Sequence, residues 1–443
     1  MGAANGCGGM SSATRLTPKA MLTPKILTTL PQSTPKSVMA DLVAGITVAM
    51  VALPLSLAIA IASGAAPATG LVTAIVAGFL ISALGGSRVQ IGGPTGAFIV
   101  VVHGVIAAHG FDGLVLATLM AGVILVVAGL LRAGSLIRLV PEPVINGFTI
   151  GIAAIIALSQ LPDAVGITLP AGTPAEAMER LPAIWAARDS LDWPSLAVGL
   201  ATIIAIVGLR RAFPRFPGLI VAVALASAAV ALWDLPVDTL GARFGALPAS
   251  LPMPSLPVVT LARLIELLPS ALIIAFLAGV ESLLSAMVAD RMVQGKHRPS
   301  AEILAQGVAN IGSALMGGLP ATGAIARTAT NVRAGGRTPL AGIFHAIVIL
   351  VVMLLAAPMA GYLVMPALAG LLIVTAWNMS EPQHWRGYLT TGRISDRMLL
   401  ILTLVLTVLA DLTVAIAVGV AIGLALRLRR RDAPPADWTP PDR

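Results

Sequence analysis

Long apolar stretches follow one another from about residue 41 to residue 427, with only short polar breaks between them. A helix needs about 20 apolar residues to cross the hydrocarbon core of a bilayer. Charged residues make up only 11% of the 443-residue chain, whereas soluble domains carry about 25%. The pattern predicts an all-α polytopic membrane protein. It excludes a disordered chain, a disulfide-stabilised secreted domain and an ordinary soluble enzyme.

Hydropathy divides this region into fourteen apolar segments, of which the third and the tenth are shorter than a full crossing. Asp41 is expected to cap the first segment at its N-terminus. The expected ranges are 41–61, 68–84, 94–109, 113–131, 142–160, 193–212, 216–233, 268–289, 300–316, 322–334, 339–358, 362–378, 396–411 and 412–427.

Positive charge predicts the orientation of these segments in the cell membrane, either a bacterial inner membrane or a plasma membrane. Lys and Arg gather in the cytoplasmic loops of multi-pass proteins. With both termini in the cytoplasm and an even number of crossings, the only Lys or Arg residues expected outside are Arg180, Arg188, Arg243 and Arg263. We therefore expect a disordered cytoplasmic N-terminal tail over residues 1–37 and a cytoplasmic C-terminal tail over residues 431–443.

The net charge of +8 does not indicate a nucleic-acid partner, because the cations are scattered between apolar segments and aromatic residues make up only 4% of the chain. The single cysteine and the five histidines form no metal-ligand spacing. Nor do the apolar segments contain a zinc-protease motif or a Gly-x-Ser-x-Gly motif. We expect no enzyme activity, no metal site and no cofactor.

An internal repeat links the two short segments. Gly93-Pro94-Thr95-Gly96-Ala97-Phe98 in the third segment is similar to Leu319-Pro320-Ala321-Thr322-Gly323-Ala324-Ile325 in the tenth, and both contain Thr-Gly-Ala. Seven segments separate the copies, so they would run in opposite directions through the membrane. This predicts two inverted seven-segment repeats over residues 38–235 and 268–430, joined by an extracellular connection over 236–267.

The glycines and prolines before these short segments predict half-helices that begin near the middle of the bilayer. Two helix N-termini that face each other would present unpaired N–H groups and positive dipole ends to an anion. An anion could approach the backbone closely at four small residues, namely Gly96, Ala97, Gly323 and Ala324. The alternative is that small residues here only permit tight helix packing.

Glu281 is an acidic residue in the middle of an apolar segment, with Ser285 one helical turn later. An ionisable group at membrane depth is costly and normally faces a polar cavity, so Glu281 is a candidate for binding and releasing a coupled proton. The alternative is a neutral structural Glu bonded to a backbone carbonyl. Arg327, inside the tenth segment, could add positive charge to the anion site or pair with Glu281. It could instead extend to the cytoplasmic surface.

These motifs resemble those of the SulP family of anion transporters, also called solute carrier family 26. The resemblance covers about residues 38–430. The matching motifs are Asp41-Leu-Val-Ala-Gly-Ile-Thr-Val-Ala-Met-Val-Ala-Leu-Pro54, Gly85-Gly-Ser-Arg-Val-Gln-Ile-Gly-Gly-Pro-Thr-Gly96, Pro141-Glu-Pro-Val-Ile-Asn-Gly-Phe-Thr-Ile-Gly151, Glu281-Ser-Leu-Leu-Ser-Ala and Pro320-Ala-Thr-Gly-Ala-Ile-Ala-Arg-Thr-Ala-Thr-Asn331.

The resemblance implies the fourteen-segment inverted-repeat fold that nucleobase permeases share, with short strands before half-helices three and ten. A core domain (segments 1–4 and 8–11) would move as an elevator past a gate domain (segments 5–7 and 12–14). The implied anion-contacting residues are Leu55, Thr95, Gly96, Ala97, Gly323, Ala324 and Ile325, and Arg327 matches a basic position found in many relatives. Family members usually continue into a cytoplasmic STAS domain, which we do not expect within residues 431–443.

By the same resemblance Glu281 matches the acidic position associated with cation coupling. With Ser285 it is more similar to proton-coupled than to sodium-coupled members, which carry Asp followed by Thr. The sequence thus predicts proton-coupled symport of a small anion of the sulfate, bicarbonate or dicarboxylate class, with a possible homodimer in the lipid bilayer. The alternatives are a chloride/bicarbonate exchanger, a nucleobase permease of the same fold and a passive channel.

Overall fold

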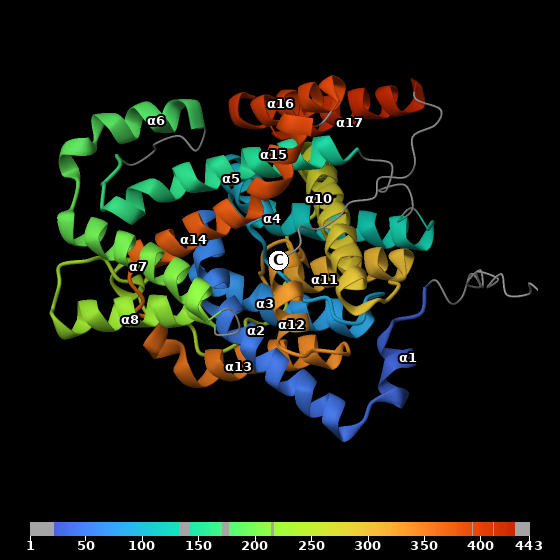
Figure 1. Cartoon of the computed structure of the whole chain (residues 1–443), viewed down its shortest axis with the longest axis horizontal. Coiled ribbons are helices and arrows are strands. Elements are labelled where there is room, and N and C mark those ends of the chain that lie inside the picture. Colours follow the sequence, from blue (N-terminus) through green and yellow to red (C-terminus); the bar gives the residue numbers. More distant parts are fainter. Residues whose placement is uncertain are drawn as a thin grey trace, which may run out of the picture.

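The computed structural model describes residues 22–132, 134, 141–170, 177–213, 217–391, 393–410 and 412–429. These residues are mostly helical, with one pair of two-residue strands (Figure 1). The α-helices are α1 (Ile26–Thr29), α2 (Pro35–Ala62), α3 (Pro67–Leu84), α4 (Ile99–Leu130), α5 (Glu142–Val165), α6 (Ala177–Ala186), α7 (Trp193–Ala212), α8 (Gly218–Leu232), α9 (Leu240–Phe244), α10 (Leu261–Val293), α11 (Pro299–Leu315), α12 (Ile325–Arg333), α13 (Leu340–Ala360), α14 (Met365–Met379), α15 (Pro382–Thr391), α16 (Ile394–Leu409) and α17 (Leu412–Arg429). The 3-10 turns are η1 (Leu30–Gln32), η2 (Gly96–Phe98) and η5 (Arg188–Ser190), and the strands are β1 (Gly92–Gly93) and β2 (Thr322–Gly323).

Each of the predicted apolar ranges contains a helix. The ranges 94–109 and 113–131 fall in the single helix α4, whose backbone leaves the helical conformation at Gly110 (φ 70°, ψ 178°). Within the described part of the chain, seven helices are long and apolar enough to cross a membrane, and α8 and α14 are shorter apolar helices. The chain is therefore a multi-pass membrane protein.

The helices pack in two groups. One group contains α2, α3, α4, α10, α11, α12 and α13, and the other contains α5, α7, α8, α14, α16 and α17. In Figure 1 the second group lies at the top and left of the molecule. Small residues bring members of a group together: a Cβ atom at Gly122 of α4 would lie only 2.8 Å from the backbone oxygen of Gly307 in α11. Such close approach between backbones is typical of membrane helices.

The start of α2 differs from the prediction. Thr34 caps this helix and forms a capping box with Ser37, so the helix begins before Asp41. Asp41 lies inside α2 and is fully buried. Its carboxylate accepts hydrogen bonds from the backbone N–H groups of Arg337 (2.6 Å) and Thr338 (3.0 Å) and from the Thr338 hydroxyl (2.6 Å). The prediction of Asp41 as the N-cap was wrong, because the residue instead ties α2 to the turn before α13.

The N-terminal region is also more ordered than predicted. Residues 1–21 lie outside the described residues, but α1 and η1 follow within the range expected to be disordered. The backbone N–H of Lys25 donates to Gly85 O (2.8 Å), and its ammonium group donates to Lys296 O (3.0 Å). Burial and the nearby Arg298 lower the pKa of Lys25. The prediction failed because docking through backbone groups leaves no hydropathy signal.

The predicted connection over residues 236–267 contains helical structure at both ends. The short helix α9 lies within it, and α10 begins at Leu261 because the Thr260 side chain accepts a hydrogen bond from the Arg263 N–H. The predicted C-terminal tail over residues 431–443 lies outside the described residues.

Candidate functional site

The two strands cross near the centre of the first helix group. β1 pairs antiparallel with β2, with Gly92 opposite Gly323 and Gly93 opposite Thr322. The Ala324 N–H extends the pairing by donating to Ile91 O (2.9 Å). A helix follows each strand at once, η2 and α4 after β1 and α12 after β2. Because the strands are antiparallel, two helix N-termini start side by side and lead away in opposite directions.

The first N–H groups of each of these helices have no acceptor within their own helix. They belong to Gly96 and Ala97 on one side and to Ile325 and its neighbours on the other. Together with the positive ends of the two helix dipoles, such groups favour a bound anion. The short strands and the paired helix starts agree with the prediction made from the glycine and proline residues.

The sequence repeat is out of step with this geometry. Thr95-Gly96-Ala97 opens a helix, whereas Thr322-Gly323 forms the strand and the second helix begins at Ile325. Pro94 lies before the helix rather than in its first turn, and Pro320 precedes the strand. The match of Thr-Gly-Ala therefore located the two segments but did not align them residue by residue.

Arg327 lies beneath the strand crossing, with its side chain buried (2% exposed). One terminal nitrogen, Nη2, donates to Pro94 O (2.5 Å). Within the described part of the chain, its Nε and Nη1 atoms have no hydrogen-bond partner. The guanidinium fits here because Gly93 has no side chain: a Cβ atom there would overlap Nη1. The interpretation of Arg327 as a side chain that extends to the cytoplasmic surface was wrong.

Glu281 connects α10 to the start of the first half-helix. Its Oε2 atom accepts a hydrogen bond from the Thr95 hydroxyl (2.9 Å), a contact with a side chain rather than with a backbone carbonyl. The positive charge of Arg327 also acts on this carboxyl group. Opposite charges at this depth stabilise each other because the surrounding dielectric is low. The structure thus brings Thr95, Glu281 and Arg327 into one polar cluster.

Ser285 is buried one turn from Glu281 but bonds elsewhere. Its hydroxyl lies 3.1 Å from the Thr328 hydroxyl, which also accepts a hydrogen bond from the Ile91 N–H (3.1 Å). Ser285 and Thr328 therefore hold α10, α12 and the end of β1 together. Thr328 was missed in the sequence, although it directly follows Arg327 in the quoted motif.

Gly96 and Ile325 face the second helix group. A Cβ atom at Gly96 would lie 3.4 Å from the Ile156 side chain of α5 and 3.7 Å from the Met379 sulfur of α14. Ile325 lines a cavity of about 40 Å³ whose other walls include Asn146 and Thr149 of α5. The helix starts therefore border the boundary between the two groups.

Leu55 and Ala97 belong to the apolar surroundings of the site. Leu55 is buried in α2, in the same cluster of packed apolar residues as Phe98, and Ala97 packs against that cluster. Ala324 is buried and stands as the N-cap of α12. No group of His, Cys, Asp and Glu able to hold a metal ion is found among the described residues.

Gly323 packs directly against Gln90, a residue that sequence reasoning did not select. The Gln90 amide donates to the Ser282 hydroxyl (2.9 Å) and backbone oxygen (3.3 Å). A Cβ atom at Gly323 would overlap this amide group. Gln90 therefore occupies the space that a larger residue at position 323 would need.

We expect Gly323→Ala to lower anion uptake by at least about tenfold, because the added methyl group displaces Gln90 and shifts the strand crossing. The measurement is initial uptake into proteoliposomes at equal amounts of reconstituted protein. Gly104→Ala is the matched control, since Gly104 is a helical glycine with open space around it. Equal uptake by the Gly323 variant and the wild type would contradict the expectation.

Comparison with known proteins gives a consistent family. The model of the Sulfate permease family matches residues 38–403. The chain is 42% identical over 347 residues to "Putative sulfate transporter YvdB" of Bacillus subtilis (strain 168), covering 77% of this chain and 64% of that protein. It is 34% identical over 346 residues to "Bicarbonate transporter BicA" of Synechocystis sp. (strain ATCC 27184 / PCC 6803 / Kazusa), covering 76% of this chain and 60% of that protein.

Solved structures share the fold. The transmembrane domain of a cyanobacterial bicarbonate transporter BicA superposes with a TM-score of 0.76 at 30% identity, covering 89% of this chain and 98% of that one. The murine Solute Carrier 26 family member A9 anion transporter in the inward-facing state gives a TM-score of 0.83 at 18% identity, covering 96% and 74%. These relatives are named as transporters rather than enzymes, as the sequence predicted.

The chain spans less than two thirds of the length of these two curated relatives. The family model nevertheless matches most of the chain, from the first residues of α2 into α16. Together with the strand crossing between two helix starts, this match shows that the chain belongs to the sulfate permease (SulP, solute carrier 26) family.

Proposed function

We propose that this chain is a secondary active transporter that carries a small anion of the sulfate, bicarbonate or dicarboxylate class. The observation that carries the proposal is the buried guanidinium of Arg327 beside two helix N-termini. A buried cation is costly unless a negative partner compensates it. Glu281 supplies one negative charge, and a transported anion bound at the helix starts supplies another while it is bound. The printed names of the relatives, which include sulfate and bicarbonate transporters, support the same class of substrate.

Glu281 would carry the coupled proton. Protonation removes its negative charge, which leaves the positive charge of Arg327 and of the two helix dipoles free to attract an anion. Proton and anion then favour each other's binding, and such coupling is reciprocal. The hydrogen bond from Thr95 places Glu281 at the start of the half-helix itself. The cycle would therefore be proton–anion symport rather than sodium coupling.

The two helix groups would act as core and gate. The core would consist of segments 1–4 and 8–11 and would carry Glu281, Arg327 and both half-helices. The gate would consist of segments 5–7 and 12–14, and the core would move past it as an elevator. This assignment implies fourteen segments in two inverted repeats, over residues 38–235 and 268–430, with both termini in the cytoplasm and a homodimer in the bilayer. The cavity between Ile325 and α5 supports a path along this boundary.

Uptake into proteoliposomes tests the proposal. Purified protein is reconstituted, and entry of radiolabelled sulfate, bicarbonate, succinate and uracil is measured with and without an inward proton gradient. We expect one of the three anions to accumulate only when the gradient is present. Uptake of uracil alone would indicate a nucleobase permease. Gradient-independent counterflow would indicate an exchanger, and conductance without saturation would indicate a channel.

A further inference from the structure

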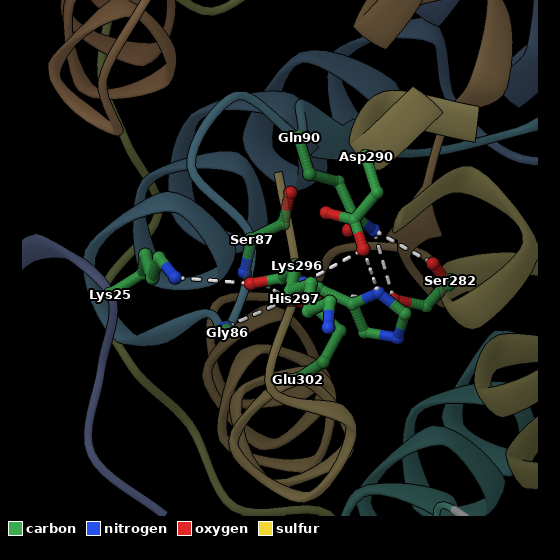
Figure 2. A network of polar contacts seen from close by, with 9 residues as sticks. All are labelled: Lys25, Gly86, Ser87, Gln90, Ser282, Asp290, Lys296, His297 and Glu302. Carbon is green, nitrogen blue, oxygen red and sulfur yellow. Dashed lines mark hydrogen bonds and ion pairs between the residues drawn. The ribbon is translucent and has the colours of Figure 1, made fainter. Parts of the chain in front are cut away.

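A second buried carboxyl group, Glu302 of α11, lies outside the cluster around Glu281. Its side chain is fully buried. Figure 2 shows it among residues from three separate parts of the chain: the loop after α3, α10, and α11 with the loop before it. A carboxyl group so placed must be compensated by hydrogen-bond donors, since a buried acceptor without a partner is costly.

Four donors converge on this carboxyl group. Its Oε2 atom accepts from the backbone N–H groups of Gly86 (2.9 Å) and Ser87 (3.1 Å). Its Oε1 atom accepts from the Ser282 hydroxyl (3.1 Å) and the Gln306 amide (3.0 Å). An ionised carboxylate can only accept hydrogen bonds, so it satisfies all four donors at once. The surroundings are thus built for the charged form of Glu302.

The same contacts reach the strand crossing through Ser282. While this hydroxyl donates to Glu302, its oxygen accepts from the Gln306 amide (2.8 Å) and from the Gln90 amide (2.9 Å). Gln90 lies directly against Gly323 of β2 and is followed in the chain by Ile91 and β1. Ser282 is also the neighbour of Glu281 in the sequence. A chain of hydrogen bonds therefore leads from Glu302 to both strands and to the turn of α10 that carries Glu281.

The loop before β1 is held from the other side as well. The Arg298 N–H donates to Gly86 O (3.0 Å), and its guanidinium donates to Thr23 O (2.8 Å). Nearby, the His297 ring lies 2.7 Å from Asp290, which also accepts from the His297 N–H. These contacts fix the loops around Glu302, so the position of its carboxylate is transmitted to β1 rather than lost in a mobile loop.

We propose that Glu302 is a positioning residue for the anion site: its carboxylate sets the place of β1, β2 and the two helix starts by way of Ser282 and Gln90. The part of this proposal that concerns anion affinity rests on the function proposed above. Glu302 does not touch the anion. It acts only through the residues that hold the backbone at Thr95–Ala97 and Gly323–Ile325.

The variant Glu302→Gln tests the charge at constant shape. Its amide group has one acceptor oxygen and one donor nitrogen. Whichever way it turns, the nitrogen faces donors, either the N–H groups of Gly86 and Ser87 or those of Ser282 and Gln306. The double variant Glu302→Gln/Gln306→Glu restores the buried negative charge one helical turn away, out of line with Gly86 and Ser87. Glu179→Gln, an exposed site on α6, is the control for loss of one negative charge.

We expect Glu302→Gln to raise the KM for the transported anion about tenfold while Vmax changes by less than about twofold. In hydrogen exchange of the full chain in lipid nanodiscs, residues 85–98 and 319–328 should exchange faster, with α7 and α8 unchanged. The double variant should behave like the single one, because the position of the carboxylate matters and not only its charge. Glu302→Asp, which keeps an acceptor pair, should recover part of the affinity.

Two results would overturn the proposal. The first is unchanged exchange over residues 85–98 and 319–328 in Glu302→Gln. The second is an increase spread evenly over the whole chain, with a fall in Vmax at constant KM, which would give Glu302 only a general structural role. The exchange measurement needs no substrate. If the wild type transports none of the anions, the proposed function fails, and the exchange pattern alone still decides whether Glu302 holds the strand crossing.

Discussion

Replacement of Glu281 by Gln is expected to abolish accumulation of the anion under a proton gradient while anion exchange persists. Gln keeps the size of the side chain and an oxygen that can accept the Thr95 hydrogen bond, but it cannot bind or release a proton at accessible pH. Coupling of this kind is worth about 5- to 150-fold in affinity. We therefore expect gradient-driven uptake to fall by at least about tenfold, measured as radiolabelled anion retained in proteoliposomes.

The sign of this effect follows from the charges at the site. A neutral residue at position 281 leaves the positive charge of Arg327 uncompensated, so the anion should bind at least as tightly as in the wild type. Exchange of internal for external anion should then continue and lose its dependence on pH. Accumulation against a concentration gradient by the Gln variant, driven by pH as in the wild type, would disprove proton coupling through Glu281. Glu179→Gln again serves as the control.

Replacement of Arg327 by Lys is expected to lower the uptake efficiency, Vmax/KM, by about 10- to 100-fold even though the charge is retained. The guanidinium reaches Pro94 O with one nitrogen and keeps two further nitrogens beside the strand crossing. A Lys ammonium is a shorter-range point charge and cannot keep this planar, forked arrangement. The geometry around β1 should therefore loosen, and the positive charge should move away from the helix starts.

The matched control is Arg333→Lys at the exposed end of the same helix. It changes the same chemical group outside the cluster and should leave uptake within about twofold of the wild type, as surface substitutions usually do. Binding of the anion, measured by calorimetry on protein in detergent, separates affinity from transport rate. Wild-type affinity in Arg327→Lys would show that this residue has no part in anion binding.

The element pattern was predictable because membrane helices carry a strong apolar signal. Every expected range contains a helix, and the short strands stand where Gly92-Gly93 and the residues around Pro320 interrupt the apolar pattern. The candidate residues Thr95, Glu281 and Arg327 were also found in the sequence, because charged and broken stretches at membrane depth are rare. What the structure adds is the contacts between them.

The errors share a physical cause, which is that hydrogen bonds between distant residues leave no local pattern. Asp41 has the composition of a helix cap, but its partners lie at Arg337 and Thr338. Glu302 stands near the start of an apolar segment and resembles a residue at a membrane surface, although its donors come from Gly86 and Ser87. Such pairings depend on how the two halves of the chain are placed against each other.

The pairing of β1 with β2 has a consequence for biosynthesis. Gly92 is opposite Gly323, so its partner strand is synthesised long after β1 itself has left the ribosome. Until then the backbone groups of β1 have no strand to pair with, and exposed backbone groups are not tolerated in lipid. The first half of the chain must therefore wait, shielded by water or by the insertion machinery, and the anion site can only be completed late, once residue 323 has been delivered to the membrane.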